Sequence, residues 1–217
     1  MEKALERLRQ EARRCQDCPL WANATQTVFG AGDPHARVML VGEQPGDEED
    51  RKGLPFVGPA GRLLDRALEA AGVEREHLYV TNAVKHFKWE PASGRSGKRR
   101  LHKTPAQREV DACRQWIERE IEAVRPSVIV ALGATAARSL FGRQFRVSLG
   151  RGRFVENPHA PYAFATYHPS ALLRLRDERE KEAAFAQLVK DLALIRKALR
   201  SATAAPPRHR AGASAPR

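Results

Sequence analysis

Residues 38–50 read VMLVGEQPGDEED, an apolar run followed by a turn that glycines bracket and acidic side chains fill. The run predicts a buried strand, and Gly42 and Gly46 let the backbone after it approach a ligand closely. A helix is expected soon afterwards, over residues 59–71, where apolar residues recur at helical spacing. In open α/β sheets, ligands bind beyond the carboxyl ends of the strands. Glu43 and Gln44 are therefore placed to act on a polar substrate.

The rest of the chain alternates between strand and helix patterns. Beyond a first strand at 37–41, we expect strands over 78–82, 127–132 and 163–167, an extra short one at 154–155, and helices over 2–14, 104–124, 133–140 and 178–200. Residues 88–103 are expected to form a long basic loop, after which Thr104-Pro105 opens a helix. The alternation predicts an α/β fold: a single three-layer α/β/α domain, residues 1–200, with a central, mainly parallel four-stranded sheet. Residues 201–217 lack periodicity and are expected to be a disordered basic tail.

Polar side chains follow three of these strands at the points where they end. Glu43 follows the first strand, Asn82 ends the second, and His168 follows the fourth. The carboxyl ends of parallel strands meet at one rim of a sheet. We therefore expect Glu43, Asn82 and His168 to converge there.

The composition indicates an anionic partner. The formal net charge is +12 and the sequence pI is about 10.2, which favours nucleic acid, although a generally basic surface is the alternative. No run approaches the roughly 18 apolar residues that a membrane span needs, so no membrane partner is expected. The N-terminal residues are charged and lack an apolar signal core, which favours a cytoplasmic protein. We expect a monomer.

Three cysteines are too few for a disulfide framework and indicate a metal site or free thiols. Cys15-x-x-Cys18 lies at the end of a predicted helix rather than after a strand, which disfavours a thioredoxin-like motif. Cys113 lies on the helix predicted to open at Thr104 and could add a third thiolate. A buried small hydrophobic role for Cys113 is equally consistent with the sequence.

Several separated motifs resemble one known family. The stretch GEQPGDEED, the segment NAVKH at 82–86 and His168-Pro169-Ser170 resemble motifs of the uracil-DNA glycosylases that carry an iron–sulfur cluster, close to family 4. Gln44 after Glu43, together with KRRLHKTP at residues 98–105, resembles the UdgX branch of that superfamily. The resemblance covers roughly residues 15–195. It implies a uracil-DNA glycosylase-like fold and uracil-containing DNA, single- or double-stranded, as the partner.

The resemblance also implies a cofactor. Members of this family hold a [4Fe–4S] cluster with four cysteines, and His86 stands here where one of the four would be. Imidazole can replace thiolate on cluster iron. The implied ligands are therefore Cys15, Cys18, His86 and Cys113. Zinc is the alternative metal, because three cysteines and one histidine are also a common structural zinc set. His86 could instead be a packed histidine beside Phe87.

The resemblance assigns roles within the predicted site. Phe56 matches the ring that stacks on a flipped uracil, and Asn82 matches the amide that reads its edge. His168 matches the residue that stabilises negative charge on uracil O2. The catalytic residues expected are Glu43, His102 and His168, and the substrate-binding residues expected are Gly42, Gln44, Asp47, Phe56, Asn82, Arg100 and Ser170.

His102 is expected to have the most unusual role. In UdgX-type proteins, the histidine of a KRRxHKTP loop attacks C1′ of the sugar after uracil leaves, and the protein stays covalently bound to the abasic site. The expected function is thus uracil excision followed by formation of a His-linked adduct. The alternatives are a multiple-turnover family 4 glycosylase and a non-catalytic, possibly zinc-stapled, DNA-binding repair module. If the KRRLHKTP loop served only to contact DNA, its basic residues would bind phosphates and take no part in the chemistry.

Overall fold

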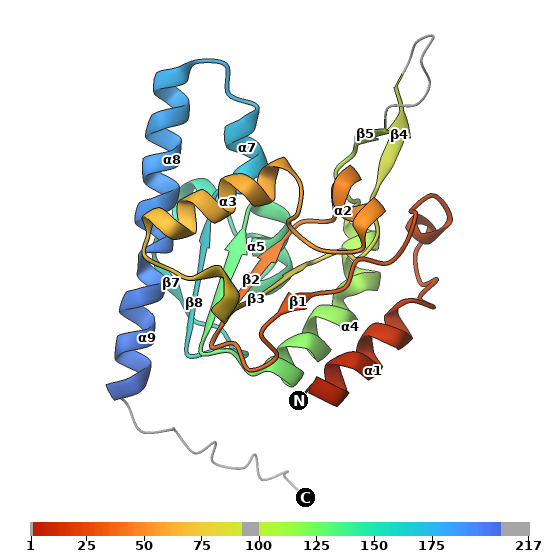
Figure 1. Cartoon of the computed structure of the whole chain (residues 1–217), viewed down its shortest axis with the longest axis horizontal. Helices are drawn as coiled ribbons and strands as arrows, with labels where there is room; N and C mark the ends of the chain where they lie inside the picture. The colour runs from red at the N-terminus through yellow and green to blue at the C-terminus, as the bar shows by residue number, and fades with distance from the viewer. Residues whose placement is uncertain (1, 93–99, 205–217) are drawn as a thin grey trace, which may run out of the picture.

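A β-sheet lies at the centre of the molecule, between two layers of helices (Figure 1). A computed structural model of the chain describes residues 2–92 and 100–204. Four parallel strands, β2 (Val38–Gly42), β3 (Leu78–Asn82), β6 (Val128–Leu132) and β8 (Tyr162–Thr166), lie in the order β3-β2-β6-β8. Each predicted strand is confirmed, with its ends shifted by no more than one residue. Nearly every residue of these strands is buried, as expected for a sheet that is covered on both faces.

Two short strands complete the sheet at its edges. β1 (Ala31–Gly32) pairs antiparallel with β3, and β7 (Phe154–Val155) pairs antiparallel with β8. The sheet therefore has six strands rather than the predicted four, and the strand expected at 154–155 is one of the additions. The other addition, β1, was not predicted, because two residues are too short for periodicity to reveal.

Helices cover both faces of the sheet, which confirms the three-layer α/β/α fold (Figure 1). One face carries α1 (Glu2–Ala12), α4 (Gln107–Val124) and α5 (Ala134–Phe141), which pack on Met39 and Val41. The other carries α3 (Pro59–Ala70), α7 (Pro169–Leu173), α8 (Glu178–Leu192) and α9 (Leu194–Ala204), which enclose Val38 and Leu40. Alternate residues of each strand thus face opposite layers. The remaining elements are η1 (Pro19–Ala22), α2 (Asp47–Lys52), η2 (Arg75–His77) and α6 (Val147–Gly150).

The segment after β3 corrects one prediction. Where a long loop was expected, β4 (Trp89–Pro91) and β5 (Arg100–His102) form an antiparallel hairpin that pairs Trp89 with His102 (Figure 1). Three-residue strands give too little alternation to be recognised in a basic segment. The hairpin holds His102 in a defined position. Residues 93–99, between its strands, lie outside the described part of the chain.

Helix boundaries differ at two places. α4 begins at Gln107 instead of near Thr104, because the Glu109 carboxylate accepts a hydrogen bond from the Ala106 N–H at 2.6 Å and caps the helix there. The helix predicted over 178–200 is two helices, α8 and α9, that meet at Ala193. The predicted disordered tail begins too early, because residues 201–204 belong to α9, and the rest of it lies outside the described residues. Within them, no helix is long and apolar enough to span a membrane.

Candidate active site

A cavity of about 440 Å³ opens at the carboxyl rim of the sheet. Its walls come from the end of β3, the loop and helix after β2, the start of α3, the hairpin and α7. The polar and aromatic side chains that line it include Gln44, Asp47, Phe56, Asn82, His102, His168, Ser170 and Arg174. The structure therefore brings Asn82 and His168 into one pocket, as the positions of their strands suggested.

Phe56 and Asn82 form one wall of the pocket. Phe56 has a φ of 56°, in the left-handed region that costs a side-chain-bearing residue about 1–2 kcal/mol. Its ring lies 6.1 Å from the His168 ring, with 30° between the planes. A Cβ on Gly42 would stand 2.6 Å from the Phe56 ring and 2.4 Å from Asn82 Oδ1. The absence of a side chain at Gly42 therefore leaves the space that the Phe56 ring and the Asn82 amide occupy.

His168 is held as a neutral hydrogen-bond donor. Its Nδ1 accepts from the Ser170 backbone N–H at 3.1 Å and lies 2.8 Å from the Ser170 hydroxyl. An accepting Nδ1 places the ring proton on Nε2. Burial lowers the pKa of His168 to about 4, with contributions from His102 and Arg174. His168 is also the N-cap of α7, and Ser170 lies inside that helix.

Gln44 clamps the hairpin against the pocket. This side chain is only 6% exposed. Its Oε1 accepts from the Lys88 N–H at 2.9 Å, and its Nε2 donates to the Lys103 carbonyl at 2.9 Å. The same Nε2 lies 2.9 Å from His102 Nε2. Since an amide nitrogen can only donate, His102 Nε2 must accept and carries a lone pair rather than a proton.

His102 lines the pocket, and Glu43 lies next to this histidine. His102 Nε2 lies 3.7 Å from Glu43 Oε1. Burial lowers the pKa of His102, Arg174 lowers it further, and Glu43 acts in the opposite direction. The second oxygen of Glu43 accepts a short hydrogen bond from the Thr135 hydroxyl. The carboxylate is therefore fixed on one side and faces the imidazole on the other.

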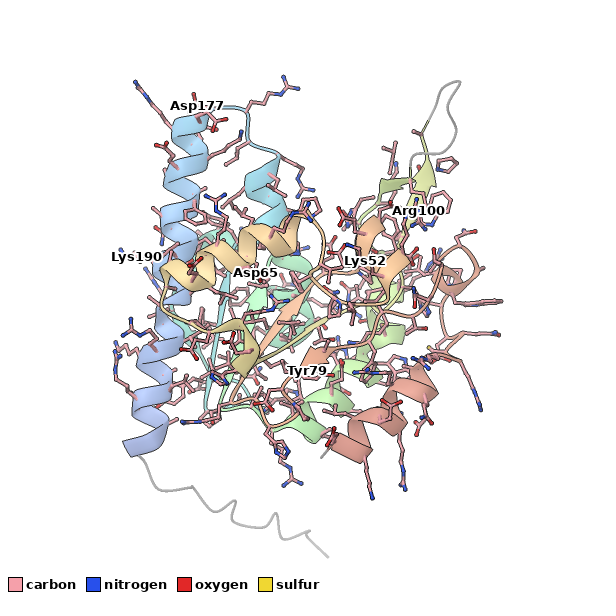
Figure 2. The ribbon with its side chains drawn as sticks, in the orientation of Figure 1. Lys52, Asp65, Tyr79, Arg100, Asp177 and Lys190 are labelled. Atoms are coloured by element: carbon pink, nitrogen blue, oxygen red, sulfur yellow. The ribbon has the colours of Figure 1, made fainter. Side chains whose placement is uncertain are left out.

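Arg100, labelled in Figure 2, anchors the hairpin through two carboxylates. Its guanidinium pairs with Asp47 and with Asp50, at 2.6 Å for the latter, and its side chain is only 11% exposed. It also lies 5.3 Å from the centre of the Phe87 ring. Arg100 and Asp47 engage each other and Asp47 also lines the pocket, so their substrate contacts stay predictions.

The three thiols gather in one region between the end of α1, the start of η1 and α4. The Cys15 Sγ accepts from the Trp116 indole N–H at 3.2 Å, and the Cys113 Sγ accepts from the Lys85 backbone N–H at 3.2 Å. Burial raises the pKa of the Cys113 thiol to about 12, and Cys15 and Cys18 pack against the same buried cluster that contains Cys113.

His86 makes its hydrogen bond with a threonine and not with any of the three thiols. Its Nε2 lies 2.9 Å from the Thr27 hydroxyl, and burial lowers its pKa. Within residues 2–92 and 100–204, no three His, Cys, Asp or Glu side chains are arranged to hold a metal ion as they stand. The donor set itself, three soft thiols with one imidazole next to the residue that binds Cys113, is chemically suited to an iron–sulfur cluster or to zinc.

Two residues of the site were not predicted. Thr135 lies in the first turn of α5, three residues after β6 ends, so an argument from the residues that directly follow strands does not reach it. Arg174 lies one helical turn after Ser170 and lines the pocket, and its charge lowers the pKa of both His102 and His168. A single arginine on a basic chain gives no comparable sequence signal.

Comparison with known proteins gives one consistent result. The model of the Uracil DNA glycosylase superfamily matches residues 29–193. The chain is 36% identical to a Type-4 uracil-DNA glycosylase of Thermotoga maritima over 198 residues, which cover 90% of this chain and 97% of the relative. It is 36% identical to the Type-4 enzyme of Archaeoglobus fulgidus over 190 residues, 83% of this chain and 90% of the relative. A Type-5 uracil-DNA glycosylase of Pyrobaculum aerophilum is 34% identical over 169 residues, 70% of this chain and 69% of the relative.

Proposed function

The chain belongs to the uracil DNA glycosylase superfamily, and we propose that its pocket excises uracil from DNA and that His102 then bonds to the abasic sugar. The observation that carries the covalent step is the position of His102. Gln44 Nε2 donates to His102 Nε2, and that nitrogen lies 3.7 Å from Glu43 Oε1. The UdgX-type resemblance of Gln44 and the KRRLHKTP loop supports the same role.

The pocket is suited to a base turned out of the helix. Uracil cannot be attacked inside the stack, so its nucleotide must enter a pocket that replaces stacking and pairing. Phe56 supplies an aromatic face, and the Asn82 amide offers a donor and an acceptor to O4 and N3–H. The neutral His168 presents Nε2–H toward the developing charge on O2. Donors placed where charge develops are usually the largest catalytic contribution.

The bond changes balance without an added reagent. The C1′–N1 bond breaks, and its electron pair leaves with uracil as an anion. The sugar becomes oxocarbenium-like at C1′, and the His102 Nε2 lone pair forms a new C1′–Nε2 bond. The positive charge passes to the imidazole ring, where the Glu43 carboxylate stabilises it until the Nδ1 proton is released. Uracil takes up a proton from water.

The second candidate is the multiple-turnover family 4 reaction, in which water rather than His102 attacks C1′. The identity of about 36% to Type-4 enzymes favours this alternative as strongly as it favours the common first step. The two readings share the pocket and differ only in the attacking group. The DNA backbone would meet the basic surface in either case, with Arg174 at the pocket rim as a phosphate contact.

We further propose a [4Fe–4S] cluster held by Cys15, Cys18, Cys113 and His86, with zinc as the alternative metal. Three gathered thiols support it, and the cluster would join the end of α1 to α4. Its chemistry when bound would be structural cross-linking of the N-terminal segment. That the protein acts as a monomer in the cytoplasm stays a prediction.

Replacing Asn82 with alanine tests the base-excision step. We expect single-turnover release of uracil to slow by about 100-fold, because one side chain supplies two buried hydrogen bonds worth about 1–2 kcal/mol each. Affinity for thymine-containing DNA should stay within about twofold, since it depends on phosphate contacts. Release of free uracil from a labelled oligonucleotide is the measurement.

Asn157→Ala is the matched control, because Asn157 bonds the Leu140 carbonyl away from the pocket. A wild-type protein that binds DNA and releases no uracil would be the non-catalytic module instead. Removal of thymine or cytosine as readily as uracil would contradict the assigned pocket.

The balance between adduct and free abasic product should depend on pH. Only neutral His102 can attack, and its pKa lies below the ordinary 6.5. The adduct fraction should therefore be constant from pH 8 to about 6.5 and fall as the pH drops further. His168, with a pKa of about 4, stays neutral across this range. A gel that separates adduct from free abasic DNA gives the fraction at each pH.

Two variants should shift that curve in opposite directions. Arg174→Gln removes a charge that lowers the pKa of His102, so the midpoint should move to higher pH. Glu43→Gln removes a charge that raises it, so the midpoint should move to lower pH. Shifts in the same direction, or a fraction independent of pH, would contradict neutral His102 as the attacking group.

A further inference from the structure

A fully buried ion pair lies behind the strand that carries Asn82. The side chains of Lys85 and Glu120 are 1% and 0% exposed and form a direct ion pair. Lys85 Nζ also donates to Thr81 Oγ1 at 2.7 Å and to the Asn82 carbonyl at 2.8 Å. Three acceptors thus use all three ammonium protons.

Glu120 is equally satisfied. Its Oε1 accepts from the Gly30 N–H at 2.9 Å and from the Tyr79 hydroxyl at 3.0 Å, and both of its oxygens lie within 3.1 Å of Thr81 Oγ1. A Cβ on Gly30 would stand 2.4 Å from both the Glu120 oxygen and the Tyr79 hydroxyl. The chain therefore keeps a glycine where the carboxylate needs the space.

Stability alone does not account for this arrangement. Two charges removed from water recover little more than their desolvation cost, and well-packed apolar side chains often serve a core equally well. The position of the pair is more informative. It holds the carbonyl of the one β3 residue whose side chain reaches the pocket, and it does so from the opposite face of the sheet.

Strand geometry explains how the pair can act on the pocket without touching it. Tyr79 and Thr81 point toward α4 and Glu120, whereas Asn82 points to the pocket. Fixing the Asn82 carbonyl fixes the peptide plane after it, and the Ala83 N–H bond to the Gly42 carbonyl, at 2.9 Å, holds the same turn from the other side. The direction of the Asn82 side chain is then set by its backbone.

We propose that Lys85 and Glu120 are positioning residues that aim the Asn82 amide at the base and so determine recognition of uracil. This inference rests on the proposed base excision. It adds a requirement that the reaction itself does not imply: uracil recognition depends on an ion pair outside the pocket.

A double-mutant cycle tests the proposal. The paired replacement Lys85→Met with Glu120→Leu removes both charges together and leaves no unpaired ion. We expect it to slow single-turnover uracil release by at least about 30-fold in the natural background, and by less than about threefold in an Asn82→Ala background, because residues acting through one group are not additive. Affinity for thymine-containing DNA should change by less than about twofold.

A merely structural role would give a different pattern. Lower stability would reduce the rate by a similar factor in both backgrounds, and such additivity would overturn the proposal. The Lys85 backbone N–H keeps its bond to Cys113 in every variant, so the thiol region is not directly altered. If the wild type released no uracil, the proposed function would fail; if it were active and the paired variant matched it, only this inference would fail.

A milder pair of variants covers the case in which the paired replacement does not fold. Thr81→Val removes the hydroxyl that links Lys85 and Glu120 and keeps the side-chain shape. Uracil release should slow by about five- to tenfold, again only when Asn82 is present. Tyr79→Phe removes a bond to the same carboxylate at its other oxygen (Tyr79 is labelled in Figure 2) and should leave the rate unchanged. Equal rate losses in the two variants would overturn the proposal.

Discussion

His102→Ser should abolish the covalent protein–DNA adduct while uracil is still released. In the wild type, uracil-containing DNA should give a species that survives SDS and heat, and matched thymine-containing DNA should give none. The serine variant lacks the imidazole lone pair that Gln44 holds in the pocket. The smaller side chain leaves space for water, which can attack C1′ and complete an ordinary glycosylase cycle.

Two measurements on the same reaction give the result. A denaturing gel reports the adduct, and release of labelled uracil reports base excision. We expect the adduct to fall below detection, a loss of at least about 1,000-fold, because the nucleophile itself is removed. Uracil release should stay within about tenfold of the wild type, since Phe56, Asn82 and His168 are unchanged.

His77→Ser is the matched control. His77 pairs with Glu74 at the opposite end of the strands, so its loss should leave both readouts unchanged. An undiminished adduct in His102→Ser would exclude His102 as the attacking group. A wild type that turns over uracil repeatedly without any adduct would assign the chain to the family 4 reaction instead.

The sheet and the location of the pocket could be predicted because they depend on local patterns. Four apolar runs, three of them followed by a polar residue, were enough to bring Asn82 and His168 to one rim. The role of Arg100 could not be predicted in this way. Its two carboxylate partners, Asp47 and Asp50, precede it by about 50 residues, and only the folded hairpin shows that it pairs with them.

The Lys85–Glu120 ion pair could not be predicted from the sequence for the same reason. In the sequence, Lys85 looks like a solvated lysine after a strand, and Glu120 looks like one of several charges on an amphipathic helix. Burial of both charges depends on Gly30, just before β1, and on Tyr79 and Thr81 of β3, two segments that are far apart in the chain from each other and from Glu120 on α4. Ion pairs between residues far apart in the chain produce no periodic pattern in the sequence.

The metal region allows a second strong prediction. Cys15 follows α1 and Cys18 precedes η1, so a cluster bound to both and to Cys113 would tie the N-terminal segment to α4. The same turn packs against the buried core, the Cys15 Sγ accepts from the Trp116 indole N–H, and Asp17 accepts from Gln115 at 2.6 Å. Metal ligation would add to these contacts, since ligand binding to the folded state adds to its free energy of unfolding.

Cys18→Ala should remove the cluster. The purified wild type should be brown, with a broad absorbance near about 400 nm from sulfur-to-iron charge transfer, and the variant should lose that absorbance and its iron. We expect the midpoint of thermal unfolding to fall by at least about 10 °C, which corresponds to a few kcal/mol for a chain of this size. Asp17→Ala, between the two cysteines, is the control and should keep its iron.

His86→Cys should also keep iron, whereas His86→Ala should lose it, because only the first supplies a fourth ligand. Equal iron in Cys18→Ala and wild type would exclude Cys18 as a ligand, and stoichiometric zinc without iron would establish the zinc alternative.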